Sequence, residues 1–121
     1  RPSTNNRHMT ALWVMVAGPY GTRATPEQRA ENLKLMNAAA LEVWKKGHVP
    51  VIGVNNALPI IEIAGDDHYE TVMMPLSLAL AERCDAVLRI GGTSSGADKE
   101  AALIRARGGR VFSSLDEVPH A

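Results

Sequence analysis

Short apolar runs alternate with helical patterns along this chain of 121 residues, and the alternation limits the folds open to it. The first run, 11–17, is continuous and is closed by Gly18-Pro19, which is typical of a strand buried on both faces. Further strands are predicted at 49–54, 85–89 and 110–112. Buried strands that alternate with helices predict an α/β fold, with a small parallel sheet covered by helices on both faces.

Helix signals lie between the first two strands. Thr25 before Pro26 and Gln28 predicts a capped helix start, and Gly47 predicts the end of that helix. The methionines and Trp44, which lies on the helical pattern, are expected in the core.

The middle of the chain is harder to assign. The segment 55–71 contains proline, glycine and charged residues and is predicted to be an irregular connection. A helix then starts near Pro75, and Cys84 on its apolar face is expected to be core. The charged cluster at 66–68 matches no metal-ligand spacing, so no metal is expected there.

Composition excludes several classes of function. Thirteen basic and thirteen acidic side chains cancel and only 4% of residues are aromatic, so no nucleic-acid polymer is expected as a partner. A single cysteine fits a reducing cytoplasm, and no apolar run reaches the roughly 20 residues that span a membrane. The polar residues 1–8 are expected to be a disordered leader or a vector-derived remnant, and 9–121 a single domain.

The turn at 91–96 carries the main functional signal. It joins the apolar run 86–88 to a helix, and in this arrangement backbone amides at the helix start face a phosphate or another anion. Glu100 lies about one turn into the helix, on the stripe that Leu103 and Ile104 continue. Because that stripe is expected to pack on the sheet, the Glu100 carboxylate should point into the protein beside the anion site.

Parallel sheets bind ligands at the carboxyl ends of their strands. The Gly18-Pro19 turn, Asn55 and the turn at 91–96 all follow predicted strands, so we expect them to converge on one crevice. Tyr20, just past the first strand, is expected to line this crevice or to cover it.

Other motifs at these turns give weaker signals. Neither a dinucleotide-binding fingerprint nor a P-loop is present, which argues against a dehydrogenase or an NTPase. The last turn also matches the G-x-S-x-G motif of α/β-hydrolases, so an esterase with Ser94, Asp116 and His120 is an alternative. Ser95 with Asp98 is expected to cap the helix.

Four short motifs together resemble the nucleoside 2-deoxyribosyltransferase-like superfamily and its small members. They occur in order and span nearly the whole chain from Leu12 to Val118. The motifs are Val16-Ala17-Gly18-Pro19-Tyr20, Lys46-Gly47-His48-Val49-Pro50, Cys84-Asp85-Ala86-Val87, and Ser94-x-Gly96-Ala97-x-x-Glu100 with the following Gly109-Arg110-Val111.

The resemblance implies a Rossmann-like sheet of four to five strands in the flavodoxin-like order. It also implies cleavage or transfer of the N-glycosidic bond of a (deoxy)nucleoside or a nucleoside 5′-monophosphate, with neither metal nor redox cofactor. In the family, the glutamate at the position of Glu100 attacks the anomeric carbon and forms a glycosyl ester, which water or a second base resolves. Tyr20 would lie near this nucleophile. The residues expected to bind substrate are Gly18, Pro19, Asn55, Gly92, Ser94 and Gly96.

The chain departs from the family's pattern at Ser77, where the enzymes commonly carry an aspartate that assists the sugar or the leaving base. Asp66, Asp67 or Glu70 is a candidate to replace this acid. A nucleotide-binding module without turnover is therefore the alternative function. A looser likeness of the glycine-rich turn to lysine-decarboxylase-like phosphoribohydrolases also involves N-glycosidic hydrolysis.

Apolar side chains are concentrated in the segment 55–71. Leu58, Ile60, Ile61 and Ile63 predict that this segment helps to form a homodimer or a larger homo-oligomer that walls off the active site.

Overall fold

The computed structural model describes residues 10–21 and 23–121, so the predicted leader at 1–8 lies outside the described residues. Within them a parallel sheet of four strands has the order β2-β1-β3-β4, which places β1 and β3 at its centre. The strands are β1 (Trp13–Ala17), β2 (Val49–Val51), β3 (Ala86–Arg89) and β4 (Arg110–Phe112).

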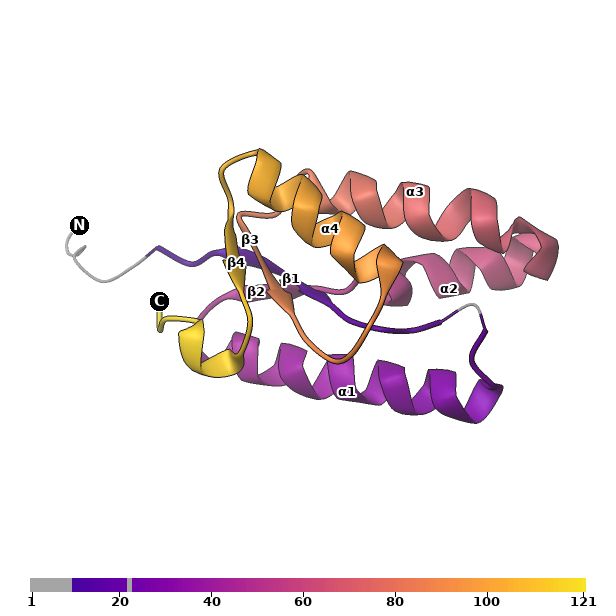
Figure 1. The fold of residues 1–121 in the computed structure, drawn as a ribbon, viewed down its shortest axis with the longest axis horizontal. Helices are drawn as coiled ribbons and strands as arrows, with labels where there is room; N and C mark the ends of the chain where they lie inside the picture. The colour runs from indigo at the N-terminus through magenta and orange to yellow at the C-terminus, as the bar shows by residue number, and fades with distance from the viewer. Residues whose placement is uncertain (1–9, 22) are drawn as a thin grey trace.

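Helices cover both faces of this sheet, as Figure 1 shows. One face is covered by α1 (Pro26–Lys45), and the other by α3 (Tyr69–Ala81) and α4 (Ser95–Ala106). The side chains of β1 alternate between the two cores, with Val14 and Val16 against α1 and Met15 and Ala17 toward α4. The predicted α/β class, with a small Rossmann-like parallel sheet, is confirmed.

Helix α1 begins as its sequence predicts. The Thr25 hydroxyl accepts a hydrogen bond from the Gln28 N–H at 3.1 Å, and the Gln28 side chain accepts one from the Thr25 N–H at 2.9 Å. The prediction that Trp44 is core is wrong, because its side chain is 62% exposed and the neighbouring Val43 is buried. Two adjacent apolar residues leave the helix phase ambiguous by one position, and the periodicity did not decide between them.

The prediction of an irregular connection at 55–71 is also wrong. A helix, α2 (Gly53–Ala64), starts directly after β2 and packs along α3, and a short 3₁₀ turn, η2 (Asp66–His68), joins the two. Pro59 lies inside α2, and Pro75 lies in the middle of α3 rather than near its start. An internal proline costs about 3 kcal/mol in an isolated helix. Here the mutual packing of the two helices, through a small core of their own, offsets that cost.

A buried histidine fixes the end of the chain to the sheet. His48 accepts a hydrogen bond at Nδ1 from the Leu12 N–H at 3.0 Å. Its other ring nitrogen, Nε2, therefore carries the proton and donates to the Pro119 carbonyl. The final 3₁₀ turn, η3 (Leu115–Glu117), is held by the Lys46 ammonium, which donates to the Leu115 carbonyl.

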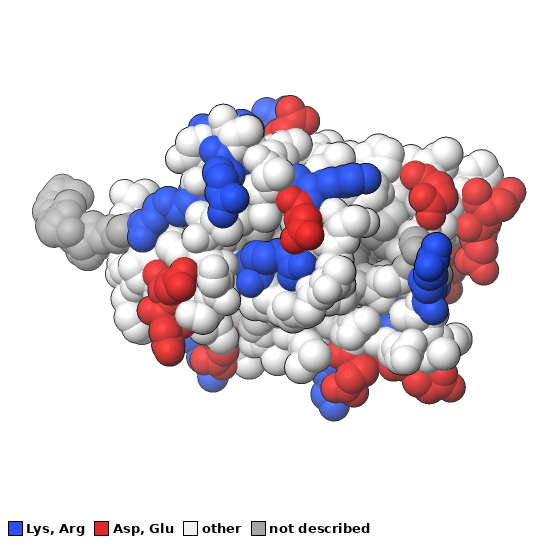
Figure 2. Space-filling view, in the orientation of Figure 1, with Lys and Arg blue, Asp and Glu red and all other residues white. Residues whose placement is uncertain are grey.

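The distribution of charged side chains on the surface agrees with the balanced charge of the sequence. On the face drawn in Figure 2, lysine and arginine side chains are interspersed with aspartate and glutamate.

Cys84 is buried as predicted, and desolvation raises the pKa of its thiol to about 11. Across residues 10–21 and 23–121, every helix is too short or too polar to cross a bilayer.

Candidate functional site

A cavity of about 410 Å³ opens at the carboxyl ends of β1 and β3, where the strand order predicts a ligand site. Its walls come from four segments: the turn after β1, the first turn of α2, one face of α3 and the beginning of α4. The predicted residues Gly18, Pro19, Tyr20, Ser94, Gly96 and Glu100 all line this cavity.

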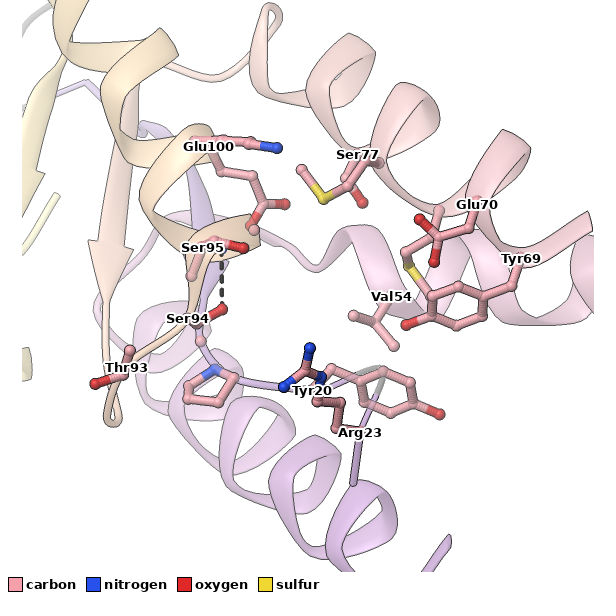
Figure 3. A pocket seen from close by; sticks show the side chains of 18 residues that line it. Tyr20, Arg23, Val54, Tyr69, Glu70, Ser77, Thr93, Ser94, Ser95 and Glu100 are labelled. Atoms are coloured by element: carbon pink, nitrogen blue, oxygen red, sulfur yellow. Dashed lines mark hydrogen bonds between the residues drawn. The ribbon is translucent and has the colours of Figure 1, made fainter. Parts of the chain in front are cut away.

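Glu100 is the most unusual group in the cavity wall. Its side chain is only 8% exposed, and it makes no hydrogen bond or ion pair within the described part of the chain. Figure 3 shows the carboxylate directed toward the space between α4 and α3. Desolvation raises the pKa of Glu100 from 4.5 to about 7, against the opposing effect of the Arg89 charge. The predicted inward orientation is therefore confirmed.

Arg89 is the cation whose charge opposes the rise in the pKa of Glu100, but its guanidinium is bound to other groups. Arg89 donates from Nε to Asp98 Oδ1 at 3.0 Å, and from its terminal nitrogens to the carbonyls of Ile90 and Gly92 at 2.6 and 2.8 Å. These bonds fix the turn after β3 and leave the Glu100 carboxylate without a partner among the described residues.

The start of α4 differs by one residue from the prediction. Ser94, not Ser95, is the N-cap, since its hydroxyl accepts a hydrogen bond from the Ala97 N–H at 3.1 Å (Figure 3). Asp98 pairs with Arg89 and does not close a capping box. The Ser94 O–H can still donate to a ligand, because accepting one bond uses only a lone pair. The first N–H groups of α4, which have no intrahelical acceptor, border the same cavity.

Two residues predicted to bind substrate do not line this cavity. Asn55 is exposed, and its side-chain amide donates to Asn37 on α1 at 2.7 Å. Because α2 already begins at Gly53, the helical rotation brings Val54 to the cavity and turns Asn55 away. Gly92 lines a second, mainly apolar cavity of about 530 Å³ beside α1.

The separation of Gly92 from the site follows from the backbone at Gly91. This residue has a φ of +77°, and a Cβ there would lie 2.6 Å from Cδ of Pro19. The turn after β3 therefore packs against the turn after β1 at a point where only glycine fits, and the chain beyond it faces α1.

Aromatic side chains form another wall of the cavity. The Arg29 guanidinium lies 5.6 Å from the ring centre of Tyr20 and 5.4 Å from that of Tyr69, which joins α1, the turn after β1 and α3. In Figure 3 the Tyr20 hydroxyl points away from Glu100, so the ring rather than the phenol oxygen of Tyr20 faces the cavity.

Tyr69 is not among the predicted site residues, because it lies in the segment predicted to be irregular. One signal could have revealed it: Tyr69, Met73 and Ser77 recur at helical spacing and so share a face.

Ser77 lines the cavity without adding a charge. The side chain is 2% exposed, and its hydroxyl has no hydrogen-bond partner among the described residues. A Cβ on Gly53 would collide with the Ser77 oxygen, so α2 and α3 approach closely at this point. Of the three acids that could replace the expected aspartate, Glu70 lines the cavity, and Asp66 and Asp67 do not.

The esterase alternative, which needs Ser94, Asp116 and His120 together, finds less support in this arrangement. Neither Asp116 nor His120 lines the cavity that contains Ser94. Within residues 10–21 and 23–121 no group of three or more potential metal ligands occurs.

No protein-family model matches the chain, and a search of curated proteins finds no match to it.

Proposed function

We propose that this protein cleaves or transfers the N-glycosidic bond of a (deoxy)nucleoside or a nucleoside 5′-monophosphate, with Glu100 as the nucleophile. The reaction class comes from the resemblance to the nucleoside 2-deoxyribosyltransferase-like superfamily. The observation that carries the proposal is the buried, unpartnered Glu100 carboxylate in a cavity at the carboxyl ends of the central strands.

The surroundings of Glu100 suit an attack on an anomeric carbon. Burial without a partner among the described residues makes the charged carboxylate costly, as its raised pKa reflects. In the transition state the sugar carries positive charge at C1′, next to the carboxylate. An interaction that strengthens between ground state and transition state lowers the barrier, which is what catalysis requires.

The rest of the cavity suits a ligand with both polar and apolar parts. The hydroxyl of Ser94 and the amides at the start of α4 offer donors to a sugar hydroxyl or a phosphate. Arg23 and Lys99 add positive charge to the lining, while Val54 and Met73 supply apolar surface for a base.

The experiment that tests the proposal is release of free base from a panel of nucleosides and their 5′-monophosphates. We expect release by the wild type and none above background by Glu100→Gln. Glu31→Gln is the matched control, since Glu31 is an exposed glutamate on α1 outside both cavities. Release by Glu100→Gln at the wild-type rate would refute the assignment.

A nucleotide-binding module without turnover is the second candidate, and Ser77 is the observation that favours it. The α3 wall carries a buried hydroxyl at the position where the family has an acid, and the close approach of Gly53 leaves little room for a larger side chain. Under this alternative, a nucleotide would raise the melting temperature, with no base released over a long incubation.

We also propose that the protein forms a homodimer or a larger homo-oligomer through α2. Ile60 and Ile63 are 48% and 88% exposed on the outer side of this helix, whereas Ile61 is buried against α3. Contiguous exposed apolar side chains are typical of interfaces. Light scattering at micromolar concentration should give a multiple of 13.0 kDa that Ile63→Lys reduces. A monomeric wild type would contradict this proposal.

A further inference from the structure

The face of α3 that lines the cavity carries a second carboxylate. Glu70, Met73, Met74 and Ser77 recur at the spacing of one helical face, and all four line the cavity. Figure 3 shows Glu70 reaching into the cavity from the α3 side, across from Glu100. Among the described residues Glu70 has no hydrogen bond or ion pair, so its oxygens are available to a ligand.

The surroundings of Glu70 differ from those of Glu100. Glu70 is exposed and adjoins the tyrosine wall, whereas Glu100 is buried beside the start of α4. Burial raises the pKa of the Tyr69 hydroxyl, Arg29 opposes this, and the Glu70 charge adds to the rise. The Glu70 carboxylate therefore lies close to the aromatic end of the cavity.

A nucleoside bound with C1′ at Glu100 and its sugar beside the polar start of α4 would extend its base toward the tyrosines and Glu70. We propose that Glu70 is the acid–base residue of the reaction, acting on the leaving base while Glu100 acts on the sugar. This inference rests on the function proposed above.

The two carboxyl groups together balance the reaction. As the bond between C1′ and the base nitrogen breaks, the nitrogen keeps the electron pair and takes the proton of Glu70. At the same time an oxygen of the Glu100 carboxylate forms a bond to C1′. Water then attacks C1′ and gives a proton to Glu70, and the ester bond to Glu100 breaks. The products are the free base and the sugar with a hydroxyl at C1′, and both glutamates return to their first state.

The test compares leaving groups that differ in their need for a proton. The guanine of 2′-deoxyguanosine must be protonated to leave readily. The base of 7-methyl-2′-deoxyguanosine already carries a positive charge, so it leaves as a neutral molecule without a proton from the protein. We expect Glu70→Gln to slow base release from 2′-deoxyguanosine by about 100-fold or more, and from the N7-methyl substrate by no more than about threefold. Glu31→Gln is the control, and a melting curve checks that each variant is folded.

The other results separate the two proposals. Equal losses on both substrates would assign Glu70 to binding, and no loss on either would remove it from the reaction, so each overturns the acid–base role. Release by Glu100→Gln at the wild-type rate would instead overturn the proposed nucleophile. No release by the wild type from any nucleoside or 5′-monophosphate of the panel would refute the proposed function, and the role of Glu70 with it.

Discussion

Replacing Glu100 by glutamine should stabilise the protein at neutral and alkaline pH, although the residue lies in the candidate active site. Glutamine has nearly the shape of glutamate but no charge, so it relieves the burial of an unpartnered carboxylate. The gain should depend on pH, because the penalty exists only where the carboxylate is ionised.

The magnitude follows from the pKa of Glu100, which rises from 4.5 to about 7 on folding. Between these values the folded protein holds a proton that the unfolded chain has released, so the stability of the wild type falls as the pH rises through this range. Ionisation of Glu100 therefore lowers the free energy of unfolding of the wild type by about 3 kcal/mol above pH 7, and by almost nothing below pH 4.5.

Urea unfolding of the wild type and of Glu100→Gln at pH 4.5, 6 and 8 measures this dependence. We expect similar stabilities at pH 4.5, and an advantage of about 3 kcal/mol for the variant at pH 8. Glu31→Gln should show no such trend, because Glu31 is exposed. A variant less stable than the wild type at pH 8 would mean that the carboxylate has a stabilising partner, which would refute the reasoning.

Three further predictions follow from the same structure. If Glu100 must be ionised to attack, kcat/KM for base release from 7-methyl-2′-deoxyguanosine, which needs no proton from Glu70, should rise with pH through about 7, and a flat profile from pH 5 to 9 would contradict this. His48→Ala should cost about 3 kcal/mol in urea unfolding, because it leaves buried backbone groups of Leu12 and Pro119 unpaired; a loss below about 1 kcal/mol would contradict this. Ser94→Ala should cost about 1 kcal/mol and Ser95→Ala almost nothing, and the reverse order would contradict the assigned N-cap.

The fold could be predicted from sequence where local signals and burial agree. Each predicted strand region contains a strand, although the one at 49–54 ends at Val51 and passes into α2 at Gly53, and the capping box at Thr25 marks the start of α1. Prediction failed where tertiary packing overrides a local signal. Pro59 indicated an irregular connection and Pro75 the start of a helix, yet both lie inside helices that stabilise each other by packing.

The candidate site was partly predictable for the same reason. Glu100 could be placed because the helical stripe through Ile104 fixes which face is buried. Asn55 could not be placed in this way, because the direction of its side chain depends on the residue at which α2 begins. A shift of that start by a few residues turns a side chain away from the cavity. Glu70 emerged as the cavity-lining acid only once α3 was seen to begin at Tyr69.

A covalent bond between a sugar and Glu100 is the central claim, and mass spectrometry of quenched reactions tests it most directly. The protein would be mixed with an excess of each nucleoside and 5′-monophosphate of the panel, quenched in acid within the first turnovers, and digested. We predict a peptide containing Glu100 that is heavier by the mass of the glycosyl group, and its absence from Glu100→Gln. Base release by the wild type with an adduct on another residue, or no base release from any substrate, would contradict the account.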